Sequence, residues 1–217
     1  MGRNRKRAVD VLAGVRRVLT SFAWLLIAPA ASPAMAEMLD SKASIALAPV
    51  GSVPTEIVLA LAPAVREVFG TDVVIAPALS LPPSAYDRRR GQYSSTALLD
   101  ALARAKRPEW ERLLGIVDVD LYIPQLNFVF GEGDFDRGVA VFSLERLRTA
   151  DAALLRRRAA TEAIHELGHT YGLAHCQNKH CVMWFSNTLA ESDRKGTRFC
   201  AEHAAQLARL HRDPFQR

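Results

Sequence analysis

Three histidines and one glutamate in the C-terminal half of the chain have the spacing of a catalytic metal site. They belong to the run HELGHTYGLAH, which begins at His165 and ends at His175. Because an α-helix has about 3.6 residues per turn, His165 and His169 lie one turn apart on one face, and both imidazoles can reach the same ion. Glu166 lies about 100° further round, beside such a metal, where its carboxylate can act as a general base.

A third ligand requires the chain to turn sharply after this helix. Gly172 can adopt the left-handed conformation that ends a helix, and His175 follows three residues later. Three protein ligands leave a fourth position open for water, as in catalytic zinc sites. The pattern HExxH alone matches many amphipathic helices by chance, whereas its extension by Gly172 and His175 is far more specific. The sequence therefore predicts a catalytic zinc bound by His165, His169 and His175.

A second cluster of metal-binding side chains follows directly. Its members are Cys176, Cys181, Cys200 and His203. Three thiolates and one imidazole are sufficient for a closed, tetrahedral structural zinc site. Two alternatives remain open. Cys176 and Cys181 could instead form a disulfide in an oxidising compartment, which leaves one odd thiol, and His180 could replace His203 as the fourth ligand.

The catalytic run needs a helix, and the apolar pattern predicts one over residues 151–171. An apolar stripe lies roughly 180° from the two histidines and consists of Ala160, Ile164, Leu167 and Tyr171. The helix is expected to bury this stripe against a sheet while the histidines face a cleft. Arg158 and Glu162, on the histidine side, are predicted to lie at the cleft rim or in solvent.

Strands and helices alternate in the part of the chain before this helix. Strands are expected at residues 44–50, 72–76, 116–123, 127–130 and 139–144, and helices at 54–69, 94–104 and 200–211. Residues 131–138 form a glycine- and acid-rich turn between the last two strands, and residues 82–93 form a polar loop. This order predicts the α/β or α+β class in a single domain.

These residues resemble the archaemetzincins, a branch of the metzincin metallopeptidases. The run HELGHTYGLAHC, followed by Cys181, Met183 and Cys200, is similar to the family's extended zinc helix, cysteine pair and methionine, and the likeness is close over residues 160–203. His203 stands where the family has its last cysteine, and zinc also accepts a set of three cysteines and one histidine.

The resemblance implies a metzincin-like fold, with a twisted mixed sheet backed by helices, an active-site helix and a small C-terminal subdomain bound to zinc. It places Met183 beneath the catalytic metal. It also makes residues 127–130 the antiparallel edge strand above the cleft, to which a peptide could bind as an added strand.

The resemblance further implies a zinc metallopeptidase with two zinc ions per chain, one catalytic and one structural. It would hydrolyse peptide bonds in a peptide or protein substrate, with Glu166 as the general base for water at the catalytic zinc. Endopeptidase and aminopeptidase activity remain equally open, and we expect a monomer. The alternatives are a zinc-stabilised peptide-binding protein with little or no turnover and a hydrolase of non-peptide substrates. An intact Glu166 favours an enzyme, because binding alone needs only the histidines.

The basic charge of the chain is confined to its first 36 residues. They hold six basic and one acidic side chains, which equals the whole formal charge of +5, and the remainder holds 22 of each sign. The high isoelectric point therefore does not indicate a nucleic-acid partner.

The same 36 residues have the layout of a signal peptide. A basic segment is followed by an apolar run over residues 18–31 and by Ala34-Met35-Ala36. We expect cleavage after Ala36 and an exported mature domain of residues 37–217, periplasmic or secreted, without stable membrane insertion. An uncleaved signal anchor is the alternative, and Arg16-Arg17 leaves both the Sec and the twin-arginine route open.

Overall fold

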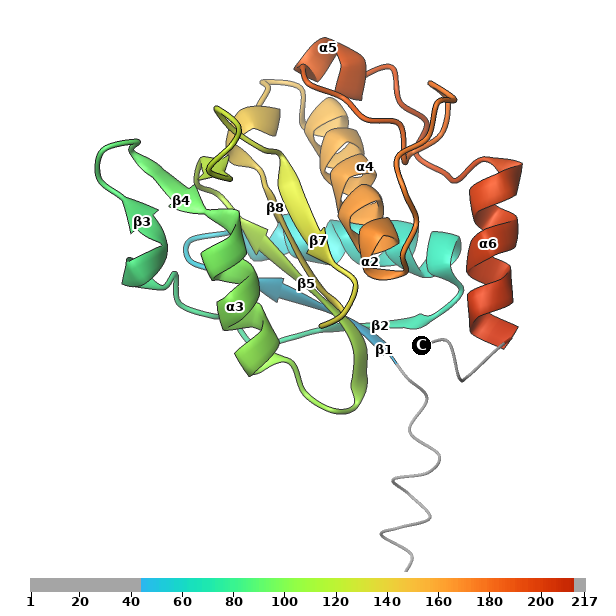
Figure 1. Cartoon of the computed structure of the whole chain (residues 1–217), viewed down its shortest axis with the longest axis horizontal. Coiled ribbons are helices and arrows are strands. Elements are labelled where there is room, and N and C mark those ends of the chain that lie inside the picture. Colours follow the sequence, from blue (N-terminus) through green and yellow to red (C-terminus); the bar gives the residue numbers. More distant parts are fainter. Residues whose placement is uncertain (1–43, 213–217) are drawn as a thin grey trace, which may run out of the picture. The chain divides into compact units, whose positions relative to one another are not determined.

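The computed structural model describes residues 44–212 (Figure 1). The expected signal peptide, residues 1–36, lies outside the described residues. No helix within residues 44–212 has both the length and the apolar character needed to cross a membrane.

A mixed sheet of five strands forms the centre of the described domain. Its order is β2-β1-β5-β8-β7, and every neighbouring pair is parallel except β7 with β8. The strands are β1 (Ser44–Pro49), β2 (Asp72–Ile75), β5 (Trp110–Val117), β7 (Gly131–Asp134) and β8 (Val139–Ser143). Parallel neighbours require crossover connections, and helices supply those from β1 to β2 and from β2 to β5, which confirms the predicted α/β class.

Helices cover both faces of this sheet. They are α2 (Thr55–Phe69), α3 (Ser95–Ala105) and α4 (Ala152–Thr170). Successive side chains of a strand point to opposite faces, so Ile45 and Leu114 join the apolar core with α2 and α4, whereas Ala46 and Leu113 join the core with α3. Figure 1 shows α3 on the opposite side of the sheet from α4. The helix α4, which carries the candidate metal ligands, is therefore packed on one face, beside the sheet edge formed by β7.

The central strand β5 differs from its prediction. The alternation of apolar and acidic residues over 116–123 predicted a half-buried strand. In the structure β5 ends at Val117, and the rest of that range contains only the two-residue strand β6 (Leu121–Tyr122). A parallel strand with a helix layer on each face is buried on both sides, so β5 is marked by a mostly apolar run instead of alternation.

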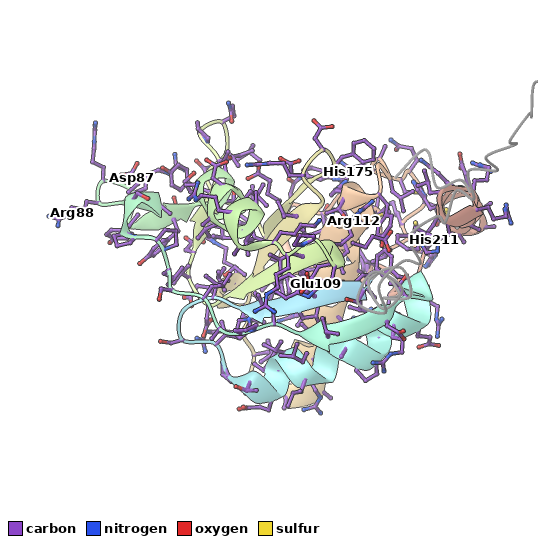
Figure 2. The ribbon with its side chains drawn as sticks, turned by 90° about the horizontal axis from the view of Figure 1, so that it is seen from below. Asp87, Arg88, Glu109, Arg112, His175 and His211 are labelled. Carbon is purple, nitrogen blue, oxygen red and sulfur yellow. The ribbon has the colours of Figure 1, made fainter. Side chains whose placement is uncertain are left out.

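The predicted polar loop at 82–93 contains short regular elements. They are the 3₁₀ turn η1 (Pro83–Ala85) and the strands β3 (Tyr86–Asp87) and β4 (Gln92–Ser94). With β6 they form a small separate sheet. Asp87 at the end of β3 and Arg88 in the turn that follows lie well away from His175 (Figure 2).

The main sheet has two edge strands, β2 and β7, and the one that contacts α4 is β7. The expectation of an edge strand at 127–130 is therefore wrong. Within the described residues, that segment makes one isolated bridge, between Val129 and Leu121. The strand forms instead in the predicted glycine-rich turn, because Gly131 and Gly133 allow the backbone to pack directly on α4. Residues 127–130 line the cleft in an irregular conformation.

Two helices follow α4 in the C-terminal part. They are α5 (Leu189–Ser192), which the sequence did not indicate, and α6 (Ala201–Arg212), which was predicted. The short helix α5 lies near the N-terminal half of α4 (Figure 1). A 3₁₀ turn, η2 (Glu145–Leu147), directly precedes α4 in the chain.

Candidate metal centre and substrate cleft

Local sequence signals set the length and the end of α4. Asp151 caps its N-terminus, with its carboxylate accepting hydrogen bonds from the backbone N–H groups of Ala153 and Leu154. The helix ends at Thr170, and Gly172 follows with a φ of 74°, the left-handed conformation expected for it. The chain then turns back and brings His175 to the two histidines of the helix.

The three histidines form one cluster. One nitrogen of each of His165, His169 and His175 lies within 4.8 Å of the others. The Nε2 atoms of His165 and His169 are 3.2 Å apart. Two nitrogens that bind one tetrahedral zinc at about 2.0–2.1 Å are separated by about 3.3 Å. The spacing therefore fits a shared ion.

The other ring nitrogens support this assignment. His165 Nδ1 lies 2.8 Å from the carbonyl oxygen of Val182, and His169 Nδ1 lies 2.9 Å from that of Leu173. A carbonyl oxygen only accepts, so each Nδ1 carries the proton, and each neutral ring directs the lone pair of Nε2 toward the other. Two facing lone pairs repel unless a cation lies between them, so the pair fits a bound metal.

Burial keeps these imidazoles neutral, which is the form that binds metal. Burial lowers the pKa of His165 well below its ordinary value, and the positive charge of Lys195 acts in the same direction. Burial and then the nearby His175 lower the pKa of His169 to about 4. The pKa of His175 is also lowered, by burial and by Lys195.

Glu166 faces the cleft beside the histidines, and its residue is 5% exposed. Burial raises its pKa well above the ordinary value, the negative charges of Glu162 and Glu132 raise it further, and Lys195 opposes them. The strand β7 covers it closely. A Cβ atom on Gly131 would lie 2.6 Å from Glu166 Cγ, so only glycine permits this approach.

The second cluster is also assembled. Cys176, Cys181, Cys200 and His203 place their ligand atoms within 4.8 Å of one another. The Cys176 and Cys200 sulfurs are 3.9 Å apart, and His203 Nδ1 lies 3.3 Å from the sulfur of Cys200 and 3.7 Å from that of Cys181. In a tetrahedral zinc site, with Zn–S near 2.3 Å and Zn–N near 2.0–2.1 Å, two sulfurs are about 3.8 Å apart, and a sulfur and a nitrogen are about 3.6 Å apart. The donor set therefore fits zinc.

The structure distinguishes the two candidates for the fourth ligand of this cluster. All three cysteines of the described chain are free thiols. His203 lies with them, whereas His180 is exposed and is not part of the cluster. Hydrogen bonds from His203 lower the pKa of the Cys200 thiol to about 6, which favours the thiolate, the form that binds metal, while burial raises that of Cys181 to about 11.

Met183 is buried between the two clusters. Its backbone carbonyl accepts a hydrogen bond from the N–H of Cys176 at 2.8 Å. Its sulfur lies 2.6 Å from where a Cβ on Gly168 would be, so it packs on α4 at the residue that precedes His169. The turn that carries Met183 thereby joins the two clusters to the helix.

A cleft of about 660 Å³ opens in front of the histidines and Glu166. Exposed apolar side chains at its margin, which the sequence did not single out, are Leu126, Phe135 and Phe185. These three residues lie in loops outside the predicted helices and strands, so no periodic pattern of apolar residues predicted that they line a cleft.

Two polar residues of α4 are buried, contrary to the expectation of a rim or solvent position. The side chain of Glu162 is 2% exposed and pairs with Lys195, and that of Arg158 is 9% exposed and pairs with Asp193. Both partners come from the segment after α5, more than thirty residues away. The tertiary fold buries them because this segment crosses the N-terminal half of α4.

An α/β domain with a histidine cluster on a helix, a glutamate beside it and a cleft in front defines a zinc-dependent metallopeptidase. A sequence profile described as peptidase family M54 matches residues 57–209. The chain belongs to this family, the archaemetzincins.

Individual relatives agree with this assignment. The archaemetzincin of Methanopyrus kandleri is 45% identical over 145 residues, which cover 67% of this chain and 82% of the relative. That of Archaeoglobus fulgidus is 40% identical over 156 residues, covering 72% and 94%.

Solved structures are similar over most of the domain. The crystal structure of the Methanopyrus kandleri archaemetzincin has a TM-score of 0.74 at 40% identity, covering 80% of this chain and 98% of that one. A zinc-dependent peptidase from Methanocorpusculum labreanum has a TM-score of 0.69 at 28% identity, covering 75% and 99%.

Proposed function

We propose that this chain hydrolyses peptide bonds in the cleft beside α4, with His165, His169 and His175 holding the catalytic zinc and Glu166 acting as general base. The observation that carries the assignment is the pair of Nε2 atoms 3.2 Å apart, each turned inward by a hydrogen bond from Nδ1 to a backbone carbonyl. This arrangement prepares two neutral ligands for one cation.

Zinc bound there supplies a Lewis acid that polarises the scissile carbonyl and makes water a better nucleophile. Glu166 takes a proton from the attacking water and passes it to the leaving amine.

The substrate is a peptide, and we infer that it binds along β7. This strand has β8 as its ladder partner on one side, and Gly131, Glu132 and Gly133 line the cleft. An extended peptide can pair with such an edge through backbone hydrogen bonds. The glycines hold the edge close to Glu166, so a peptide bound there lies within reach of the base.

A second zinc, held by Cys176, Cys181, Cys200 and His203, braces the turn that carries His175 and Met183. The distances among these four side chains support this role. We further propose that the functional unit is a monomer. Light scattering on the purified protein tests that state.

We also propose export with cleavage after Ala36. Support comes from the basic segment, the apolar run and Ala34-Met35-Ala36, together with the net neutrality of the rest of the chain.

Digestion of a peptide library by the purified protein, with and without a chelator, tests the activity. Glu166→Ala should keep its zinc and its fold but lose about 10²- to 10⁴-fold in kcat/KM, because only proton transfer is removed. His169→Ala should lose both the catalytic metal and the activity. The control is Glu109→Ala, an exposed glutamate remote from the cleft, which should behave as the wild type. Near-normal turnover by Glu166→Ala would show that the mechanism is wrong, and binding of peptides without turnover by the wild type would favour a peptide-binding protein.

A further inference from the structure

A buried lysine lines the cleft beside the proposed base. The side chain of Lys195 is 1% exposed, and Lys195 and Glu162 both contribute to the cleft wall. The Nζ atom lies 3.2 Å and 3.5 Å from the two carboxylate oxygens of Glu162. The nearer of these oxygens also accepts a hydrogen bond of 2.7 Å from the hydroxyl of Ser192.

The ammonium of Lys195 has hydrogen-bonding capacity that the protein does not use. A lysine ammonium carries three N–H donors. Among residues 44–212, Glu162 is its one acceptor. Buried donors without an acceptor are costly, and a bound group with a free oxygen would satisfy them.

Other side chains already fasten the segment that carries Lys195. Arg157 donates hydrogen bonds to the backbone carbonyls of Asp193 and Lys195, at 2.9 Å and 3.0 Å. Arg158 forms a two-bond ion pair with the carboxylate of Asp193. These contacts fasten the segment after α5 to α4 in addition to the ion pair of Lys195 with Glu162.

The position of Lys195 is suited to contact with substrate. Its partner Glu162 lies one helical turn before Glu166 on α4. The surface of the cleft that Lys195 lines is mostly apolar, and Phe128 and Phe130 also contribute to it. A charge-assisted hydrogen bond is strong in such surroundings, because little water competes for the donor.

We propose that Lys195 determines substrate specificity, with its ammonium binding a carboxylate of the peptide next to the scissile bond. The proposal rests on the peptidase function proposed above. The carboxylate belongs either to an acidic side chain or to a free C-terminus, and both present the same chemistry to Lys195.

Binding of labelled peptides to the zinc-loaded Glu166→Ala protein tests this assignment without turnover. The first set consists of amidated alanine heptapeptides labelled with fluorescein, in which the central residue is glutamate, glutamine or leucine. The second set is an alanine tetrapeptide with a free or an amidated C-terminus. Fluorescence anisotropy gives the Kd of each. We expect the carboxylate-bearing peptide of one set to bind about tenfold more tightly than its neutral counterpart. Preference within the first set identifies an acidic side chain as the ligand of Lys195, and preference within the second set identifies a free C-terminus.

Lys195→Met alone would leave Glu162 buried without its counter-ion, so the informative variant is Glu162→Gln with Lys195→Met. It should bring the ratio of carboxylate to neutral affinities close to one. The control is Lys179→Met, which removes an exposed lysine and should keep the wild-type ratio. A variant that merely loosened the segment would weaken all peptides alike and leave the ratio unchanged.

A ratio near one in the parent protein, or a ratio that survives the double substitution, overturns the role of Lys195. Turnover of the same peptides by the zinc-loaded wild type reports on the peptidase proposal separately. Peptides that bind with the expected ratio but are not cleaved would overturn that proposal and support the role of Lys195. Peptides that are cleaved without any preference would do the reverse.

Discussion

Single charged side chains join the C-terminal segment to α4. Arg158 donates two hydrogen bonds to the carboxylate of Asp193, at 2.7 Å and 2.6 Å, and a third to the backbone carbonyl of Leu147. The guanidinium is 9% exposed and the carboxylate 31%. A bidentate pair of this kind is directional and only partly screened by water. It therefore adds to stability more than the exposed ion pairs of the surface.

The pair predicts a pH-dependent contribution to stability. The hydrogen bonds from Arg158 lower the pKa of Asp193 below its ordinary value of 3.8, so the contribution is present above that value and is lost as the pH falls through the lowered pKa. Asp193→Asn should cost about 1–2 kcal/mol of unfolding free energy at pH 7 and nothing below the lowered pKa. Urea unfolding at several pH values measures the difference from wild type. Asp136→Asn, at an exposed turn, is the control, and a cost independent of pH would contradict the assignment.

At the scale of elements, the contact between β7 and α4 shapes the site. A Cβ atom on Gly133 would lie 2.6 Å from the backbone oxygen of Glu166 and 2.7 Å from Cβ of His169. Neither atom can move without shifting the helix that carries the candidate ligands. The edge strand β7 and the helix α4 can therefore pack this closely only because Gly131 and Gly133 have no side chains.

Gly133→Ala should therefore reduce both stability and activity. Overpacking costs about 1–3 kcal/mol, and a displaced helix should lower kcat/KM by about tenfold or more. The matched control is Gly115→Ala on β5, whose Cβ would meet the side-chain end of Leu102 at 2.7 Å, away from the cleft. It should lose stability and keep its kcat/KM. Equal activity of the two variants would show that β7 does not position the site.

The second candidate zinc site links α6 to the turn after α4. His203→Ala should reduce the metal content from two zinc ions per chain to one and lower the melting temperature, because the turn with His175 loses its brace. Metal analysis on the purified protein, with thiol titration under denaturing conditions, measures this. Two zinc ions in His203→Ala would exclude His203 as a ligand. One zinc in the wild type together with one free thiol would indicate a Cys176–Cys181 disulfide.

At the scale of the whole molecule, charge separates the chain into two parts. The first 36 residues carry the net charge of +5, and residues 37–217 carry 22 basic and 22 acidic side chains. Such a neutral domain offers no general attraction for polyanions, whereas a basic leader suits recognition by an export pathway.

We predict that exported material begins at Glu37. N-terminal sequencing of the periplasmic or secreted protein checks this. Replacing Ala34 and Ala36 by bulky residues should block cleavage, because signal peptidase reads small side chains at these two positions. Recovery of the intact form with Met1 in the cytosol alone would contradict export.

The local part of the site was accessible from the sequence. The positions of His165, Glu166 and His169 follow from helical pitch, and the end of the helix follows from Gly172, because each depends on residues within one or two turns. The four side chains of the second cluster were also predicted, with His203 preferred to His180, and the folded chain groups His203 with the three cysteines. Helical pitch and helix ends depend mainly on neighbouring residues, so a pattern in the sequence is enough to predict them.

Only the tertiary structure decided which strand covers the helix and which charges are buried. The edge strand lies at Gly131–Asp134, where composition indicated a turn, because strand formation depends on the neighbouring strand and on packing. Glu162 is paired with Lys195 across thirty-three positions of sequence, and nothing in the pattern around Glu162 marks it as buried. Burial is a property of the whole fold, since it depends on which distant segments cover a side chain, and the chemistry of the cleft wall follows from it.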